Sequence, residues 1–478
     1  MRGETPIGCP CRLQLEVQER PNAAIAFPCQ NRKLGTSRTT PRPPEFALPR
    51  TIAPVFSLLL ATAILLVGNG MLGTLIPIRA GIDGFATATV GIIGSVYFAG
   101  FLLGCIATPY VVRRAGHIRS FATFCGLASA APLIHALSAD PFVWSMMRVL
   151  TGFCFAGLYM VIESWLNEQS TNETRGRLFS GYLIVNLSAL TVGQLLLNAA
   201  NPAGFVLFAV VSILTSLALV PVAMTTSVQP MPIQSTRIDI WALYSLSPVG
   251  LVGSFVVGLA NAPFWTLAPL YASDSGLDTA GVSIFMAAAI IGGAVAQWPI
   301  GRISDRMDRR RVILALSLGA AAGEIALALA GMSGSMPAVL AAGFLFGVFG
   351  LTLYSVVVAH MNDHGQSESF VAISGGMLIV FSVGSIIGPT AASIGVSSFG
   401  MASIFVVTAA VHIVFAGFTL YRIAFTPALS EEQRADFVAV PVAQVQPLPT
   451  ELDPRAADEP AQEYPSGEAQ EESHEKVD

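Results

Sequence analysis

Acidic and basic residues alternate in a stretch of about ten residues between two apolar segments, and they include Arg302, Asp305, Arg306, Arg309 and Arg310. Guanidinium–carboxylate pairs are directional, and an exposed pair contributes only about 1 kcal/mol, so it can be broken and remade. We expect Asp305 to pair with arginines of its own loop and to cap a helix N-terminus. This chemistry suits a reversible lock, a gate at one side of a membrane.

A second charged group occupies the corresponding place earlier in the chain. Two acids, Glu163 and Glu168, could pair with nearby arginines, and we include all of them in the predicted gate. The arginines concerned are Arg113, Arg114, Arg175 and Arg177. The alternative is that these arginines only set the topology and contact lipid phosphates.

Arg148 lies inside an apolar segment, where a charge is costly and therefore a functional candidate. Helical spacing places it on one face with Gly152, Phe155, Tyr159 and Glu163, within about 80°. Such a face would line a cavity. Arg148 could there bind an anionic group or modulate the protonation of a nearby carboxylate. The alternative is a structural pair, or a side chain that extends to the outer surface.

Further polar residues inside apolar segments complete the candidate cavity. They are Asn69, Asn186, Gln194, Asn261, Gln297, Tyr354 and Glu324, with Trp265 as an aromatic neighbour. Amides and aromatic rings also join helices to one another, so each has a packing alternative. A carboxylate in the middle of a span, as at Glu324, should be protonated or turned inward. Glu324 is therefore our candidate for proton coupling.

The segments that carry these residues are long and apolar. The chain is 53% hydrophobic and 12% charged, whereas a soluble domain carries about twice that charge. A helix needs about 20 apolar residues to cross a membrane, and twelve segments qualify. We predict an all-α membrane protein with spans at about 53–78, 88–112, 118–139, 142–166, 177–200, 204–224, 248–271, 281–301, 312–332, 337–361, 369–393 and 401–423. Two long uncharged runs must turn, near Asn201-Pro202 and between Gly395 and Gly400.

Arginines predict the orientation of these spans. With twelve spans, the even-to-odd loops share one side, and the opposite side receives only Arg79. The first side receives Arg113, Arg114, Arg119, Arg175, Arg177, Arg237, Arg302, Arg306, Arg309, Arg310, Arg311 and Arg422. Basic loops stay in the cytoplasm, so we expect both termini to be cytoplasmic.

The two halves of the apolar region repeat. Gly152-Phe-Cys-Phe155 corresponds to Gly343-Phe-Leu-Phe346, 191 residues later, and the two uncharged runs share that offset. We predict two pseudo-symmetric six-helix halves, a transporter architecture. The predicted division is an N-terminal extension without a stable fold (1–50), a first half (51–224), a cytoplasmic linker (225–247), a second half (248–426) and an acidic tail without a stable fold (427–478). The extension is also a candidate for a wrongly assigned start. The net charge of −5 comes from the tail and gives no sign of a nucleic-acid partner.

Several motifs resemble those of one family. Gly301-Arg-Ile-Ser-Asp305-Arg306-Met-Asp-Arg309-Arg310 resembles the signature that the major facilitator superfamily carries between helices 8 and 9. The loop from Gly104 to Arg119 is similar but has lost the Asp. Arg148-x-x-x-Gly152 resembles the helix 4 motif, and Glu168-x6-Arg175 the pattern that follows it in sugar porters. The stretch 162–168 is similar to an uncharacterised bacterial branch of the superfamily. Helix 5 lacks the proline that drug–proton antiporters carry there, which weakens that assignment.

The resemblance implies a secondary active transporter in the cytoplasmic (inner) membrane that works by alternating access. Its partners would be a small-molecule solute, a proton as the coupling ion, and the lipid bilayer. We expect a monomer that is not an enzyme and that has no cofactor and no metal. Drug efflux and metabolite uptake stay open, and a non-transporting membrane sensor on the same fold is the alternative outside transport.

Overall fold

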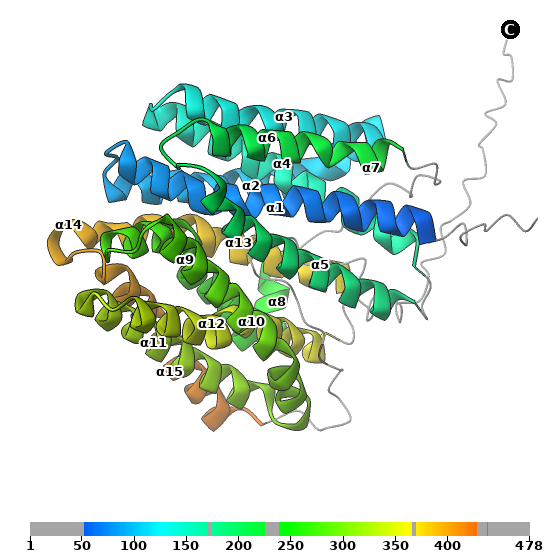
Figure 1. The fold of residues 1–478 in the computed structure, drawn as a ribbon. Coiled ribbons are helices and arrows are strands. Elements are labelled where there is room, and N and C mark those ends of the chain that lie inside the picture. Colours follow the sequence, from blue (N-terminus) through cyan, green and yellow to red (C-terminus); the bar gives the residue numbers. More distant parts are fainter. Residues whose placement is uncertain (1–51, 171–173, 225–238, 366–369, 428–436, 438–478) are drawn as a thin grey trace, which may run out of the picture. The chain divides into compact units, whose positions relative to one another are not determined.

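The computed structural model describes residues 52–170, 174–224, 239–365, 370–427 and 437, which all belong to one compact unit, Leu48–Asp478. These residues are helical or lie in turns (Figure 1). The first half contains α1 (Ile52–Ile82), α2 (Thr87–Ala115), α3 (His117–Leu137), α4 (Pro141–Glu168), α5 (Arg175–Leu196), η1 (Leu197–Ala199), α6 (Val206–Leu217) and α7 (Leu219–Ala223). The remainder contains α8 (Ile240–Leu246), α9 (Pro248–Asp274), α10 (Thr279–Arg306), α11 (Arg309–Ser333), α12 (Met336–His364), α13 (Phe370–Ile394), α14 (Val396–Phe399) and α15 (Ser403–Phe425).

Twelve spans in the described residues are long and apolar enough to cross a membrane, as the sequence predicts. Helices are the expected element because lipid offers the backbone no hydrogen-bond partners. The two predicted turns are confirmed. The first lies between η1 and α6, and the second lies between α13 and α15, where the short helix α14 intervenes.

Two local features were not predicted. The basic hairpin from 302 to 311 is mostly helical, because α10 continues to Arg306 and α11 begins at Arg309. Only Met307 and Asp308 join them, and the Asp308 carboxylate accepts a hydrogen bond from the backbone N–H of Arg310. The sixth span is also divided, at Ala218, into α6 and α7. The extension 1–50 and all of the tail except Pro427 and Phe437 lie outside the described residues, and α8 forms part of the predicted linker.

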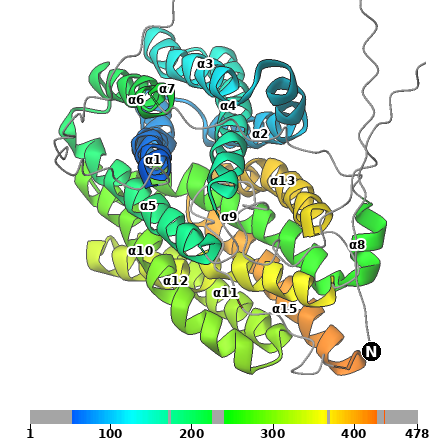
Figure 2. The same ribbon diagram turned by 90° about the vertical axis from the view of Figure 1, so that its right-hand side faces the viewer.

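Helix pairing repeats between the halves, which supports the predicted pseudo-symmetry. In the first half α1 packs on α5, α2 on α4, and α3 on both α4 and α6. In the second half the corresponding pairs are α9 with α13, α10 with α12, and α11 with both α12 and α15. Figure 2 shows α11 and α12 side by side in one half and α3 and α4 in the other.

Two glycines explain how closely the paired helices approach. A Cβ atom at Gly152 of α4 would collide with the carbonyl oxygen of Tyr97 on α2. At the corresponding crossing, a Cβ atom at Gly347 of α12 would collide with the carbonyl oxygen of Ala289 on α10. Glycine therefore lets α2 and α4 meet backbone to backbone, which fixes Tyr97 next to the first turns of α4.

Hydrogen bonds join the two halves at one end of the bundle. This end holds the turns at 83–86, 200–205, 275–278 and 400–402. We call it the arginine-poor end, because these turns contain no arginine. Ser95 of α2 and Thr390 of α13 share a hydrogen bond of 2.8 Å, and Asn198 Nδ2 donates to Ser283 Oγ of α10 at 2.7 Å. Gly94 also packs directly on Thr266 of α9. These contacts close the bundle at that end.

Candidate functional site

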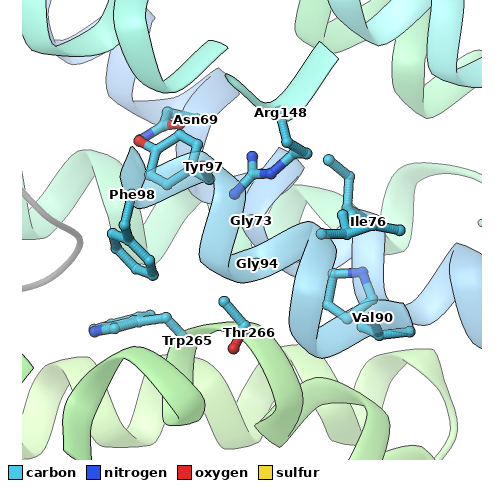
Figure 3. Close-up of a pocket in the computed structure, with 12 residues that line it drawn as sticks. Asn69, Gly73, Ile76, Val90, Gly94, Tyr97, Phe98, Arg148, Trp265 and Thr266 are labelled. Atoms are coloured by element: carbon cyan, nitrogen blue, oxygen red, sulfur yellow. The ribbon is translucent and has the colours of Figure 1, made fainter. Parts of the chain in front are cut away.

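A cavity lies where α1, α2 and α4 of the first half face α9 of the second (Figure 3). Its polar lining consists of Arg148, Asn69, Tyr97 and Thr266, and its aromatic lining adds Phe98 and Trp265. Three of these, Asn69, Arg148 and Trp265, were predicted as cavity residues. The structure therefore brings three predicted candidates from different helices to one cavity.

Arg148 contributes the charge of this cavity. It is 8% exposed, and its guanidinium carbon lies 4.0 Å from the centroid of the Tyr97 ring. Within the described residues, Arg148 Nε has no hydrogen-bond partner, and neither has Tyr97 Oη. The ion pairs of these residues do not include Arg148. The contact described for this cation is thus the face of the Tyr97 ring.

The cavity is narrow in this conformation. The centre of a water molecule can move through about 30 Å³ of it, which admits at most a few waters. Gly94 against Thr266 closes one wall. In this conformation the cavity has no room for a molecule larger than a few atoms.

The remainder of the predicted α4 face leads away from the cavity toward the other end of the bundle, which we call the arginine-rich end. Asn69 Nδ2 donates to Tyr159 Oη at 3.4 Å, and Tyr182 Oη of α5 donates to Glu163 Oε1 at 2.9 Å. Tyr159 is fully buried and Glu163 is 4% exposed. A line of buried polar groups therefore follows α4 from Arg148 to Glu163.

On α5, Gln194 and Asn186 are both fully buried. Gln194 Nε2 donates to the carbonyl oxygen of Gly70 at 3.0 Å, and its Oε1 accepts from Thr74 Oγ1 at 2.5 Å. Both ends of that amide are therefore occupied in joining α5 to α1. Asn186 lies beside Tyr182, next to the Glu163 hydrogen bond.

Three predicted residues of the second half are buried with an unsatisfied polar atom among the described residues. They are Asn261 (Oδ1), Gln297 (Oε1) and Tyr354 (Oη). Asn261 Nδ2 donates to the carbonyl oxygen of Gly350 at 3.0 Å, and the Tyr354 ring lies 5.0 Å from that of Phe381. None of the three lines the cavity around Arg148.

Glu324 lies outside this cavity too. It is 1% exposed on α11, and its Oε2 is 2.8 Å from Nδ1 of His412 on α15. The sequence predicts a functional carboxylate here but does not reveal its partner. The repeat of the two halves could have indicated this pairing. The third and sixth spans of the first half, α3 and α6, pack together, and α11 and α15 are the third and sixth spans of the second half.

Arg309 is the centre of the charged cluster at the arginine-rich end. Its Nε lies 2.7 Å from Asp363 Oδ2 on α12, and both side chains are 1% exposed. Its Nη1 donates to Asp305 Oδ1 at 3.1 Å and to Ser304 Oγ at 2.9 Å. The predicted pairing of Asp305 within its own stretch is present. The cluster fastens α10, α11 and α12 to one another within the second half.

Asp308, rather than Asp305, caps α11. It accepts from the Arg310 backbone N–H at 3.0 Å and from Arg310 Nη2 at 2.8 Å. Burial raises the pKa of the Asp308 carboxyl, but these hydrogen bonds and the Arg310 charge outweigh burial and lower the pKa below its usual value. The spacing explains the correction, because Asp308 directly precedes the first helical residue whereas Asp305 lies inside α10.

The other predicted gate residues are mostly exposed. Arg302 stacks on Trp298 at 3.7 Å and Arg113 on Tyr110 at 4.7 Å. Arg175 Nε donates to Ser170 Oγ at 3.4 Å. Arg302 and Arg113 are both exposed, and so are Arg114, Arg177, Arg306 and Glu168. Among the described residues, Glu168 makes no ion pair with these arginines.

Phe437 touches the same cluster from the C-terminal segment. Its backbone N–H donates to Asp305 Oδ1 at 2.9 Å, and its ring lies where a side chain at Gly301 would be. This contact is not predicted from the sequence. Asp363, Tyr97 and Tyr182 were also missed, because each reaches its partner from another helix.

Twelve apolar spans in two paired halves, with a buried polar cavity between them, define a membrane transporter. Comparisons with known proteins agree. Residues 250–449 match the model of the Major Facilitator Superfamily, and residues 30–220 match that of the Sugar (and other) transporter family. The chain is similar to the major facilitator superfamily of transporters.

Among similar proteins is the uncharacterized MFS-type transporter YcaD. The form from Escherichia coli O139:H28 is 29% identical over 378 residues, which is 78% of this chain and 97% of the relative. The form from Shigella flexneri serotype 5b is 28% identical over the same length. These bacterial relatives support a multi-pass protein of the inner membrane.

Solved structures share the fold. The nucleoside transporter NupG has a TM-score of 0.66 at 12% identity and covers 78% of this chain and all of its own. A bacterial homologue of the human lysosomal transporter Spinster, in an inward-facing and unoccupied conformation, has a TM-score of 0.62 at 14% identity. It covers 81% of this chain and 99% of its own.

Proposed function

We propose that the protein is a secondary active transporter that moves a small solute by alternating access, with the Arg148 cavity as its solute site. The observation that carries this proposal is the position of that cavity between the halves. It lies next to the contacts that close the bundle at the arginine-poor end. Thr266 packs on Gly94 beside the cavity, and Ser95 bonds Thr390. Separating these contacts would open the cavity toward the arginine-poor end.

The charged residues at the arginine-rich end are the proposed gate. In this conformation Arg309 and Arg310 hold their partners within the second half. Asp305 is 36% exposed, and Arg302 and Arg306 are exposed as well. They are available to the first half, where Arg113, Arg114 and Glu168 are exposed. If both termini are cytoplasmic, as the arginine distribution predicts, the conformation described here is the one that faces the cytoplasm.

Proton coupling has two candidate sites in the structure. Glu163 accepts a hydrogen bond from Tyr182 at the end of the α4 polar line, and Glu324 pairs with His412. Both carboxyls are at least nine-tenths buried. Glu163 is the better placed, because Asn69 and Tyr159 connect its helix face to the cavity.

A disulfide across the closed end tests alternating access. In a cysteine-free background, Ser95→Cys with Thr390→Cys would join the halves, since the two hydroxyls are 2.8 Å apart. Oxidation should abolish solute flux, and a reductant should restore it. The matched controls are the single variants Ser95→Cys and Thr390→Cys, each of which places one thiol at the same crossing but cannot form the cross-link. Oxidation of either single variant should leave flux unchanged.

The solute for this assay comes from comparing metabolites in strains that lack or overproduce the protein. Flux is then measured in proteoliposomes. Wild-type flux in the oxidised Ser95–Thr390 variant would contradict alternating access by these halves. A protein that binds the solute but never moves it, in either direction and with any ion gradient, would be a sensor rather than a transporter.

A further inference from the structure

Arg148 and Tyr97 carry chemical information about the solute that the family does not supply. A buried charge is normally paired, because removing an ion from water without compensation is costly. Arg309 follows this rule, with two carboxylates. Arg148 does not, since its described contact is the face of Tyr97 and its Nε has no hydrogen-bond partner.

The described residues of this site therefore supply no negative charge to pair with Arg148, and a bound ligand could supply it. The guanidinium presents several N–H donors in a plane, a geometry that fits a carboxylate. Tyr97 adds a second donor, because its hydroxyl is also buried without a partner. Two orphaned donors that line one cavity suit an anionic oxygen pair better than a neutral group.

The other walls describe the body of the solute. Phe98 and Trp265 supply aromatic surface, and Ile76, Val90 and Ile93 supply aliphatic surface. Figure 3 shows Arg148 and Tyr97 on one side of the cavity, with Trp265 and Thr266 across from them. Aromatic rings favour edge or offset contacts with a ligand ring. The cavity contains no described acidic residue to hold an ammonium group.

We propose that the solute is a small organic anion, a carboxylate on an aromatic or similarly flat apolar body, bound by Arg148 and Tyr97. This proposal rests on the proposed function, since it assigns a substrate class to the same cavity. The carboxylate accepts hydrogen bonds from the Arg148 guanidinium and from Tyr97 Oη. The ring lies between Phe98 and Trp265 once the wall at Thr266 has moved.

The test is direct binding, which does not depend on transport. Full-length protein in mild detergent is titrated with benzoate, phenylacetate and indole-3-acetate by calorimetry. The comparison ligands are benzamide and benzylamine, which keep the ring and replace the anion by a neutral or a cationic group. The wild type should bind at least one carboxylate and prefer it to both comparison ligands by about tenfold or more.

Variants locate the binding. Arg148→Met should weaken carboxylate binding by about 10- to 100-fold, since a hydrogen-bonded charge is lost. Arg148→Lys should recover part of it, because it keeps the charge but not the planar fork. Tyr97→Phe should weaken binding by about 2- to 10-fold. Arg119→Met removes an exposed arginine at the start of α3 and should bind as the wild type does.

Several results would overturn the assignment. One is a wild type that binds none of the carboxylates, and another is a preference for benzamide or benzylamine. A third is carboxylate binding that survives in a folded Arg148→Met variant. Each of these leaves the disulfide test of alternating access untouched, so a wrong substrate class is distinguishable from a protein that does not transport.

Discussion

Two buried arginines of this protein have opposite surroundings. Arg309, at the arginine-rich end of the second half, is 1% exposed and contacts two carboxylates and a hydroxyl. Arg148, beside the cavity, is 8% exposed and lies on the face of a tyrosine ring. The charge of Arg309 is neutralised by carboxylates of the fold. The charge of Arg148 has no described carboxylate partner and is available to a ligand. From this difference we propose a structural role for Arg309 and a ligand-binding role for Arg148.

The largest expected effect separates the two arginines by stability. Arg309→Met removes one member of a buried pair and leaves Asp363 without its cation. We expect a loss of about 3–5 kcal/mol in the free energy of unfolding, because breaking a buried pair strands the other charge. Unfolding by heat or by SDS, for purified protein in detergent, measures it.

The control for that prediction is the double variant Arg309→Met with Asp363→Leu. It replaces the pair by apolar side chains and should recover much of the lost stability. If the single variant is as stable as the wild type, the Arg309 cluster does not hold α10, α11 and α12 together, and the contrast with Arg148 fails.

A second prediction concerns the packing that places Tyr97 under Arg148. Gly152→Ala puts a methyl group against the Tyr97 carbonyl oxygen and should force α2 and α4 apart. We expect a loss of about 1–3 kcal/mol in unfolding free energy, the usual range for overpacking. Near-UV circular dichroism should also change as the tyrosine moves.

Gly126→Ala on α3 is the matched control. A Cβ atom there meets nothing within 4 Å. The substitution should be neutral, or stabilising by up to about 1 kcal/mol, since alanine favours a helix over glycine. Equal losses at both glycines would mean that the collision at Gly152 is not what matters.

Much of the fold follows from the sequence, but the site follows only in part. Span number, the two turns and the pairing of Asp305 with an arginine depend on run length and short spacing, which are visible in one sequence. Asp363, Tyr97, Tyr182 and His412 act across helices. In apolar helices, whose faces differ little from one another, a single sequence does not show which faces meet. Asn69 and Arg148, the polar candidates that line one cavity, are residues whose polarity stands out against an apolar segment.

A third prediction uses the second charged residue at the junction of α10 and α11. Asp308→Ala removes the cap of α11 and should cost about 0.5–2 kcal/mol of unfolding free energy. The pKa of Asp308 is lowered in the folded state, so its contribution is present above the unfolded pKa and is lost as the pH falls through the folded value.

The pH dependence has a defined sign and window. Unfolding of the wild type should become easier below about pH 4, near the ordinary pKa of aspartate. Asp308→Asn keeps a capping side chain without a titrating group, so it should lose less stability at neutral pH and show a weaker dependence in this window. Parallel curves for the wild type and Asp308→Asn would assign the acid sensitivity to other carboxyls.

The smallest expected effect is the one that decides the comparison. Arg148→Met makes the same change as Arg309→Met, at a residue of similar burial, but it strands no carboxylate among the described residues. Removing an uncompensated buried charge should leave the free energy of unfolding within about 1 kcal/mol of the wild type, or raise it. Lost contact with the Tyr97 ring works in the other direction, by about 0.5–2 kcal/mol. The two terms therefore nearly cancel.

A loss as large as that of Arg309→Met, measured in the same SDS titration, would show that Arg148 is paired in the folded protein and is part of its framework. A small change, together with lost carboxylate binding, would show that solute binding, rather than the stability of the fold, requires this charge.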